Sequence, residues 1–401
     1  MNIGVDLSSL NNKSLNQGVH RYIEGILISF KKKNNYNFQI YVNREFYHYA
    51  KKNYSSKNFK IITLEKKNFL IKKFLTFFII ILGYLGINAR TLHYSVINYL
   101  NRENKKIIEK NSNLIIFLNA HENSYNLSIS KIINFHDVLH KTLPSLLSKR
   151  EIFLRNVIYE NCSKSSDIII ASSNSVGNDF LKYLKIKKTK IRIIKEGVDL
   201  KKFSTKDNYK KKLNLPKEYL FYPAQFWKHK NHISLIEYVK KFNMKNKKPL
   251  NLIFSGKKKS FFFEVINSIK KIKSQRIRYI GEVSTNKLIS TYLNSKYVVV
   301  PSLHESSSLV ILEAIALKKT IIASNIKPFK EMSKVFKINI YNLKNYRSFE
   351  KVILKLRNTR NDKLKKYSEL NYKKLKKYSW DAIAEKYIDL AKILINDYKR
   401  I

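Results

Sequence analysis

Two glutamates, eight positions apart, are the most informative residues for chemistry in this sequence. Glu305 lies in the polar loop 302–308 that follows an apolar run, and Glu313 lies inside the helix that we expect over about 308–317. The N-terminus of a helix offers backbone N–H groups to an anion such as a diphosphate. A carboxylate just before it can accept hydrogen bonds from sugar hydroxyls, and one a turn or two further in can reach a ribose diol. The alternative is that Glu305 caps the helix and Glu313 is a surface charge.

Lys230 lies in the loop between another expected strand and the helix that follows it. The segment 219–232 reads YLFYPAQFWKHKNH, with a strand ending at Ala224 and a loop that leads to Lys230. Ligands of open parallel sheets bind outside the carboxyl ends of the strands, so a lysine there can neutralise the phosphate oxygens of a departing group. Because lysine is abundant throughout the chain, the alternative is that Lys230 is one more surface lysine.

The elements that must position these residues alternate between strands and helices. This alternation predicts an α/β protein with two successive, doubly wound parallel sheets. We expect a first domain over 1–200, a linker over 201–216, a second domain over 217–379 and a C-terminal helix over 380–401. The expected strands are 2–7, 38–42, 61–64, 114–118, 132–135 and 167–171 in the first domain, then 219–223, 250–255, 278–280, 297–301 and 320–323 in the second.

Composition restricts the class of protein further. The chain has 401 residues, 44% hydrophobic, which excludes a disordered polymer and a single small domain. A lone cysteine, Cys162, excludes a disulfide scaffold and fits a cytoplasmic protein. The formal net charge of +50 suggests a polyanionic partner, either a nucleic acid or an anionic membrane. The alternative is drift towards residues with A/T-rich codons, because the lysines are spread along the whole chain. No DNA- or RNA-binding motif is present, so we do not expect a nucleic-acid partner.

Several families are disfavoured by motifs that the sequence lacks. It contains no GxxxxGK[ST] loop, no GxGxxG, no HExxH, no DxD pair and no Cys/His spacing for a metal. P-loop ATPases, dinucleotide oxidoreductases, zinc hydrolases and DxD transferases therefore lose most of their support. We expect no metal and no cofactor.

One apolar stretch bears on the membrane. Residues 74–87 read FLTFFIIILGYLGI, and fourteen helical residues reach only about 21 Å of the roughly 30 Å hydrocarbon core. We expect a buried or interfacial helix that can dock on an anionic leaflet, since each lysine near the surface adds up to about 1 kcal/mol. The lysines before it are Lys66, Lys67, Lys72 and Lys73. The start, MNIGVD, is typical of a first strand and not of a signal peptide. A cytoplasmic protein, with peripheral attachment to the inner face of the membrane as an option, is the expectation.

On these motifs the chain resembles the family-four retaining glycosyltransferases, which have the GT-B fold of two Rossmann-like domains facing a cleft. Glu305 and Glu313 stand in the setting PSxxExxxxxxxEA, and the AQFWxHKNH segment is similar to a subgroup from bacterial surface-polysaccharide clusters. Further matches are QGVHRYI at 17–23, HD at 136–137, EGVD at 196–199 and SW at 379–380. The resemblance also implies that the C-terminal helix returns to the first domain.

The resemblance implies roles for matched residues. Lys230 would hold the diphosphate, Glu305 the hydroxyls of the transferred sugar and Glu313 the ribose. His136 would face the reacting sugar from the first domain, unless it is a strand-end histidine satisfied by Asp137. The remaining donor-binding residues would be Gly18, Gln225, Gly281, Val283, Ser307, Ser308 and Leu309. Gly18 would let backbone approach the phosphates. Gln225 stands where many relatives have arginine, and three serines, 306–308, replace a glycine-containing stretch.

The activity that this resemblance implies is a metal-independent, retaining hexosyltransferase. Its donor would be a nucleotide-diphospho-sugar, and its acceptor a growing, lipid-linked surface glycan of a bacterium, such as O-antigen, lipopolysaccharide or capsule. Three alternatives stay open at this point: a basic nucleic-acid-binding protein, a sugar-nucleotide epimerase of the same fold, and a catalytically inactive scaffold.

Overall fold

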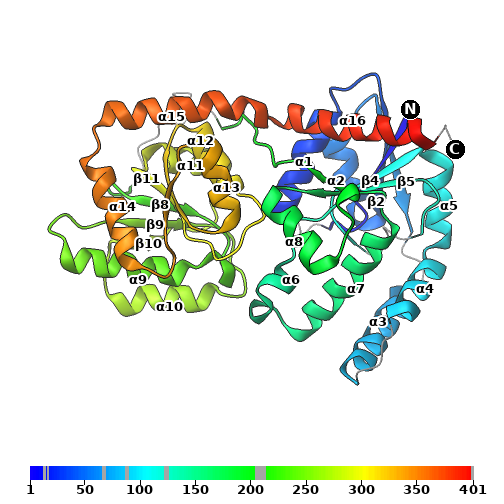
Figure 1. Ribbon diagram of the computed structural model, residues 1–401, viewed down its shortest axis with the longest axis horizontal. Helices are drawn as coiled ribbons and strands as arrows, with labels where there is room; N and C mark the ends of the chain where they lie inside the picture. The colour runs from blue at the N-terminus through cyan, green and yellow to red at the C-terminus, as the bar shows by residue number, and fades with distance from the viewer. Residues whose placement is uncertain are drawn as a thin grey trace. The chain divides into compact units, whose positions relative to one another are not determined.

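The computed structural model describes residues 1–11, 15, 18–65, 69–85, 90–121, 126–203 and 214–398. Gln17, Lys66, Lys67, most of the expected linker and the end of the 74–87 stretch lie outside the described residues. The chain forms two compact units, Met1–Glu196 with Trp380–Ile401 and Gly197–Ser379 (Figure 1).

The first unit contains a seven-stranded parallel sheet in the order β3-β2-β1-β4-β5-β6-β7. Its strands are β1 Asn2–Asp6, β2 Asn37–Asn43, β3 Phe59–Leu64, β4 Leu114–Phe117, β5 Ser130–Asn134, β6 Ile168–Ala171 and β7 Ile191–Ile193. Its helices are α1 Gly18–Phe30, α2 Arg44–Tyr54, α3 Phe69–Tyr84, α4 Arg90–Leu100, α5 Arg102–Asn111, α6 Leu139–Thr142, α7 Lys149–Ser165, α8 Asn174–Leu184 and α16 Trp380–Tyr398. Central strands such as β4 and β6 are buried along their whole length, as expected for a parallel sheet covered on both faces.

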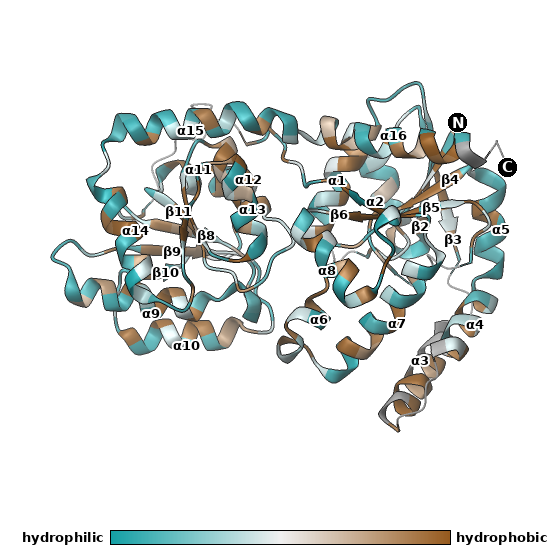
Figure 2. Ribbon diagram, in the orientation of Figure 1, coloured by the Kyte–Doolittle hydropathy of each residue, from teal (hydrophilic) through white to brown (hydrophobic). Residues whose placement is uncertain are grey.

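The second unit contains a six-stranded parallel sheet in the order β10-β9-β8-β11-β12-β13. Its strands are β8 Leu220–Pro223, β9 Leu252–Ser255, β10 Ile277–Tyr279, β11 Tyr297–Val300, β12 Thr320–Ser324 and β13 Asn339–Tyr341. Its helices are α9 His232–Lys245, α10 Phe262–Ile272, α11 Thr285–Asn294, α12 Leu309–Ala316, α13 Lys327–Val335, α14 Tyr346–Asn358 and α15 Asn361–Leu375, with a short 3-10 turn, η6, at Lys228–Lys230. Figure 2 shows hydrophobic residues on the strands inside each unit.

Each sheet has one place where the order of the strands reverses. In the first unit this point lies between β1 and β4, and in the second it lies between β8 and β11. Loops leave neighbouring strands in opposite directions there, which opens a crevice at the carboxyl edge of a doubly wound sheet. The predicted α/β fold class, with two doubly wound parallel sheets, is confirmed.

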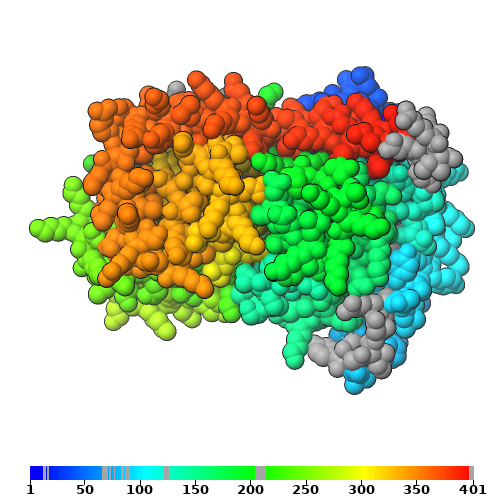
Figure 3. Space-filling view, in the orientation of Figure 1, coloured from blue at the N-terminus to red at the C-terminus, as the bar shows by residue number. Residues whose placement is uncertain are grey.

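The C-terminal helix α16 belongs to the first unit, where it packs against α1 (Figure 3, red). The Trp380 ring meets the Tyr22 ring edge-on at 5.5 Å, and the hydroxyls of Tyr22 and Tyr387 hydrogen-bond to each other. The first and last residues of the second unit lie next to each other, because the Val198 N–H donates to the Tyr378 carbonyl at 2.9 Å. The EGVD and SW motifs therefore mark the two points where the chain enters and leaves this unit.

Candidate functional site

The loops after β8 and β11 bring a lysine and a glutamate into contact. Lys230 ends η6, and Glu305 lies between β11 and α12. The Lys230 ammonium is 2.6 Å from Glu305 Oε1, and the two side chains are only 20% and 13% exposed. Because β8 and β11 flank the reversal point of the sheet, this ion pair lies where ligands of such folds bind. Lys230 is therefore a partly buried, ion-paired lysine, and its diphosphate-binding role stays a prediction.

Neighbouring polar groups hold the two loops in place. Ser302 Oγ donates to Glu305 Oε1 at 2.7 Å. The Tyr222 hydroxyl donates to the Lys230 carbonyl at 3.0 Å, and Asn231 Nδ2 donates to the Pro301 carbonyl at 3.0 Å. A buried charge is costly unless it is paired and hydrogen-bonded, and here the ammonium and the carboxylate meet both requirements. The arrangement presents one cation and one anion, already oriented, at one position.

The start of α12 separates the two glutamates. Ser308 is the N-cap, and its hydroxyl accepts from the Ile311 N–H, so Glu305 does not cap this helix. Ser307, Ser308 and Leu309 lie at the helix N-terminus, as predicted from the sequence. Glu313 lies one turn further on, is 1% exposed, and accepts a hydrogen bond from the Tyr292 hydroxyl at 2.9 Å. Glu313 is therefore not a surface charge, and its ribose-binding role stays a prediction.

Two glycines shape the neighbouring strand ends. Gly256 follows β9, and a Cβ there would lie 2.2 Å from the Ala224 carbonyl oxygen, so only glycine lets the loops after β8 and β9 approach this closely. Gly281 follows β10 with a φ of +88°, and its carbonyl accepts from Ser255 Oγ at 2.9 Å. Val283 is half-buried two residues later. Gln225 Oε1 accepts from Trp227 Nε1 at 3.0 Å.

Two of the residues predicted to belong to the site, His136 and Gly18, lie in the first unit. His136 follows β5, and its Nε2 lies 3.1 Å from the Leu118 carbonyl. Burial lowers the pKa of His136, and the charge of Asp137 opposes this shift. Asp137 pairs with Arg155 at 3.0 Å, and His136 hydrogen-bonds to a main-chain carbonyl. Gly18 begins α1, and no described atom lies within 4 Å of where its Cβ would be.

Two further polar residues meet at the reversal point of the first sheet, and neither was predicted from the sequence. Asp6 ends β1, and its Oδ1 lies 3.3 Å from His121 Nε2 in the segment after β4. Ser8 donates to the same oxygen from its N–H and its hydroxyl. The signal in the sequence was weak: Asp6 lies near the end of one expected strand, and His121 follows another by three residues. The strand order, which makes β1 and β4 neighbours, could not be predicted.

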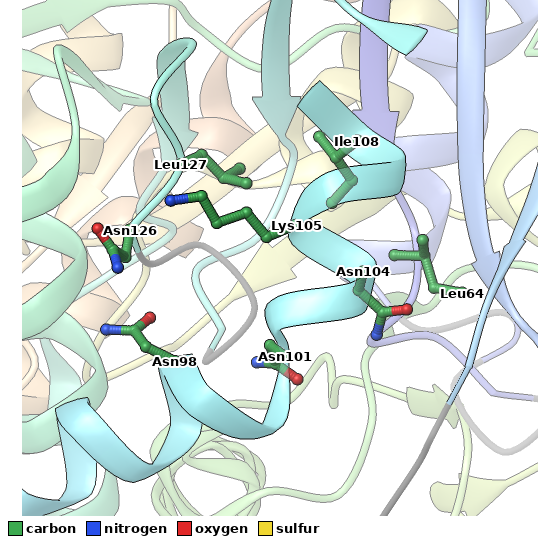
Figure 4. Close-up of a pocket in the computed structure, with 8 residues that line it drawn as sticks. All are labelled: Leu64, Asn98, Asn101, Asn104, Lys105, Ile108, Asn126 and Leu127. Atoms are coloured by element: carbon green, nitrogen blue, oxygen red, sulfur yellow. The ribbon is translucent and has the colours of Figure 1, made fainter. Parts of the chain in front are cut away.

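A small pocket lies elsewhere in the first unit and contains none of these residues. Figure 4 shows it lined by Leu64, Asn98, Asn101, Asn104, Lys105, Ile108, Asn126 and Leu127. Its volume is about 20 Å³, which is room for little more than a water molecule. Within the described ranges, no group of three or more His, Cys, Asp or Glu residues is placed to hold a metal ion.

A buried histidine supports the lysine loop from behind. His232 opens α9, is fully buried, and stacks on Phe226 with ring centroids 4.5 Å apart. Burial, together with the charge of Lys230, lowers the pKa of His232 to about 3. The folded chain therefore keeps this ring neutral at pH values where a histidine in the unfolded chain, with a pKa near 6.5, takes up a proton.

The titration of His232 predicts loss of stability in acid. Its contribution to stability is complete above about pH 6.5 and is lost as the pH falls towards 3, by up to about 1.4 kcal/mol per pH unit. We expect a His232→Phe variant, which preserves the stacking, to lose less stability than the wild type across this window. Urea unfolding at a series of pH values measures this difference. Parallel pH profiles for the two proteins would contradict it.

Comparison with known proteins identifies the second unit. Residues 204–374 match the model of the family described as glycosyl transferases group 1. The second unit is a group 1 glycosyltransferase domain. None of the curated proteins matches the chain closely enough to count as a relative. The Lys230–Glu305 pair and Glu313 all lie within the matched range.

Solved structures extend the likeness of this glycosyltransferase domain to the whole fold. A glycosyltransferase from Rickettsia africae matches with a TM-score of 0.66 at 17% identity, covering 98% of each chain. HepE from Anabaena, in complex with UDP and glucose, gives 0.70 at 12% identity, covering 98% of this chain and 99% of its own. Sucrose-phosphate synthase from Thermosynechococcus elongatus gives 0.72 at 14% identity, covering 99% and 100%. With its two parallel-sheet units, the chain has the GT-B fold.

Proposed function

We propose that this chain is a metal-independent, retaining hexosyltransferase that uses a nucleotide-diphospho-sugar. The observation that carries the proposal is the Lys230–Glu305 ion pair at the carboxyl edge of β8 and β11, inside the glycosyltransferase domain. A cation–anion pair at this edge is complementary to a ligand that brings a diphosphate and a ring of hydroxyls. The complexes of HepE with UDP and with UDP and glucose support a nucleotide sugar as the donor.

The reaction that follows uses few side chains. As the donor enters, the Lys230 ammonium turns to the diphosphate oxygens and the Glu305 carboxylate accepts from sugar hydroxyls, with Ser302 keeping it oriented. The bond between the anomeric carbon and the phosphate oxygen breaks first, and Lys230 with the α12 N-terminus stabilises the charge that develops on the leaving group. The acceptor hydroxyl attacks from the same face and retains the configuration. Its proton passes to the departing phosphate, so no side-chain base is required.

The acceptor is proposed from the subgroup resemblance and from the charge of the chain. The AQFWxHKNH segment is similar to enzymes of bacterial surface-polysaccharide clusters, so we infer a growing, lipid-linked glycan such as O-antigen, lipopolysaccharide or capsule. A net charge of +50 would attract the protein to the anionic lipids at the cytoplasmic face of the membrane. His136 and Gly18, in the first unit, are the residues that we assign to the reacting sugar and to the phosphates.

A donor panel tests the proposal. Ligands that bind only the native state raise its stability, by about 2.7 kcal/mol at a concentration of 100 Kd. We expect at least one nucleotide-diphospho-hexose to raise Tm and to transfer labelled sugar to a lipid-linked acceptor with EDTA present. Sugar interconversion without an acceptor would replace the proposal by an epimerase. Selective, salt-sensitive binding of a nucleic acid without any Tm shift by nucleotide sugars would replace it by the nucleic-acid-binding reading. Donor binding with no turnover would leave an inactive scaffold.

The ribose role of Glu313 can be separated from its structural role. In a Glu313→Gln variant the amide oxygen can still accept from Tyr292, so the fold should persist, while the charge-assisted bonds to a ribose diol are lost. A hydrogen bond to a charged group contributes about 1.5–3 kcal/mol, so we expect the Kd for the nucleoside diphosphate to rise about 10–100-fold. Isothermal titration measures this change. A Tyr292→Phe variant is the control, since it removes the partner but keeps the carboxylate. An unchanged Kd in Glu313→Gln would exclude the ribose role.

A further inference from the structure

The helix α3 combines two properties that rarely occur together. Its only charged residues are Lys72 and Lys73 and most of the others are apolar, a pattern typical of a helix buried within a core. Yet it projects from the edge of the first unit, away from the sheet (Figures 1 and 2). One side is packed: Ile79 and Ile80 are buried, and α3 contacts α4 and α7. The opposite side is not covered by any described residue.

The uncovered side forms a continuous stripe, which we call the α3 stripe. Its members are Phe74, Phe77, Phe78, Ile81 and Leu85, all more than a third exposed. Their spacing of three, one, three and four residues places them on one face of a helix. Phe74 is 69% exposed and Phe77 is 63% exposed, which is unusual for phenylalanine. Leu92 and Tyr99, on the neighbouring α4, add two more exposed side chains. Contiguous exposed apolar surface of this kind marks a site of interaction.

The charge around the stripe decides what can cover it. Between residues 66 and 101 the sequence contains no acidic residue and five basic ones: Lys66, Lys67, Lys72, Lys73 and Arg90. Arg102, just beyond, is paired with Glu103 and adds no free charge. A second copy of the chain would bring the same positive charge, on a protein of net charge +50, against it. An anionic lipid surface offers apolar chains for the stripe and negative headgroups for the bases.

The length of the helix excludes a different membrane role. No helix in the described part of the chain is long and apolar enough to cross a bilayer. The 16 residues of α3 reach about 24 Å, and only one of its sides is uncovered. A helix with these properties lies along the interface and buries one face just below the headgroups.

We propose that the α3 stripe is a docking surface for anionic membranes, with the Phe74 and Phe77 side chains inserted among the lipid chains. This proposal rests on the proposed function in one respect only, that the acceptor is a lipid-linked glycan in the membrane. Docking itself requires neither donor nor transfer, so the two proposals can fail independently.

Flotation of the full chain with vesicles tests the docking surface. We expect binding to vesicles of phosphatidylcholine with phosphatidylglycerol and little binding to phosphatidylcholine alone. The double variant Phe74→Glu/Phe77→Glu should bind at least tenfold more weakly, because two large apolar side chains no longer insert and two negative charges are added. The matched control is Met244→Glu/Phe263→Glu, which makes the same charge change at two residues of the second unit that are 78% and 75% exposed. This control should bind like the wild type.

Insertion has its own readout. A tryptophan introduced by Phe77→Trp should gain fluorescence that brominated lipids quench, beyond any quenching of the native Trp227 and Trp380 in the wild type. Equal losses of binding in both double variants would show that general charge, not the stripe, drives binding. Wild-type binding by the stripe variant, or no added quenching at position 77, would also overturn the proposal. So would a wild-type dimer that the stripe variant converts to monomer, because a second copy would then be the occupant. Donor Kd, measured without vesicles, should be the same in all variants.

Discussion

Replacing Lys230 by alanine is expected to lower kcat by about 10²–10³-fold, the loss seen when one preorganised charge-stabilising donor is removed. The reason is that the second unit holds the Lys230 ammonium, paired and partly buried, at the reversal point between β8 and β11. The loss should appear in kcat more than in donor KM, because charge on the leaving phosphate grows as the glycosidic bond breaks. Steady-state kinetics with a labelled donor measures both.

The chain supplies a matched control for this substitution. Lys296 forms an ion pair with Glu218 at 2.5 Å, in the same unit, just before β11 and therefore at the opposite edge of the same sheet. Lys296→Ala removes the same chemical group and breaks the same kind of pair, yet kcat should stay at the wild-type value. Turnover near normal in Lys230→Ala, or an equal loss in Lys296→Ala, would remove Lys230 from the mechanism. Thermal unfolding of both variants separates lost chemistry from lost folding, since Lys230→Ala leaves Glu305 without its cation.

Most strands were predictable because buried parallel strands are short apolar runs between polar turns. Two were missed, β7 at Ile191–Ile193 and β13 at Asn339–Tyr341. Each has three residues and lies at the edge of its sheet, and both contain a polar residue. Three residues are too few to show the alternation or the apolar run by which a strand is predicted, and an edge strand has a neighbouring strand on one side only. Only the sheet beside it makes such a segment a strand.

The site shows where prediction from sequence ends. Lys230 and Glu305 were predictable singly, because each follows a strand that feeds a helix. Their contact was not, since it depends on β8 and β11 being neighbours in the sheet, although Lys230 and Glu305 are 75 positions apart in the sequence. The same holds for Tyr292, which reaches Glu313 from α11, and for His121, which reaches Asp6 from the segment after β4. In each case the residue type gave the chemistry, and the packing of the elements in the folded unit selected the partner.

Replacing Gly25 in the first helix is expected to destabilise the fold. Gly25 lies in the middle of α1, and a Cβ there would come within 2.2–2.5 Å of three atoms of the Trp380 ring. A glycine inside a helix ordinarily costs about 0.5–1 kcal/mol relative to alanine, so alanine should stabilise an unobstructed site. Here the added methyl must displace a large ring that is held against Tyr22. Overpacking of this kind costs about 1–3 kcal/mol, so the clash outweighs the gain.

We therefore expect Gly25→Ala to lower the free energy of unfolding by about 1 kcal/mol, the difference between the middle values of these two terms. Gly18→Ala is the matched control on the same helix, because no described atom lies within 4 Å of its added Cβ, and its stability should not fall. Urea denaturation measures both. Combining Gly25→Ala with Trp380→Phe should recover part of the loss, since the smaller ring makes room and two residues in contact are coupled. If Gly25→Ala were as stable as Gly18→Ala, the proposed close packing of Trp380 against α1 would be contradicted.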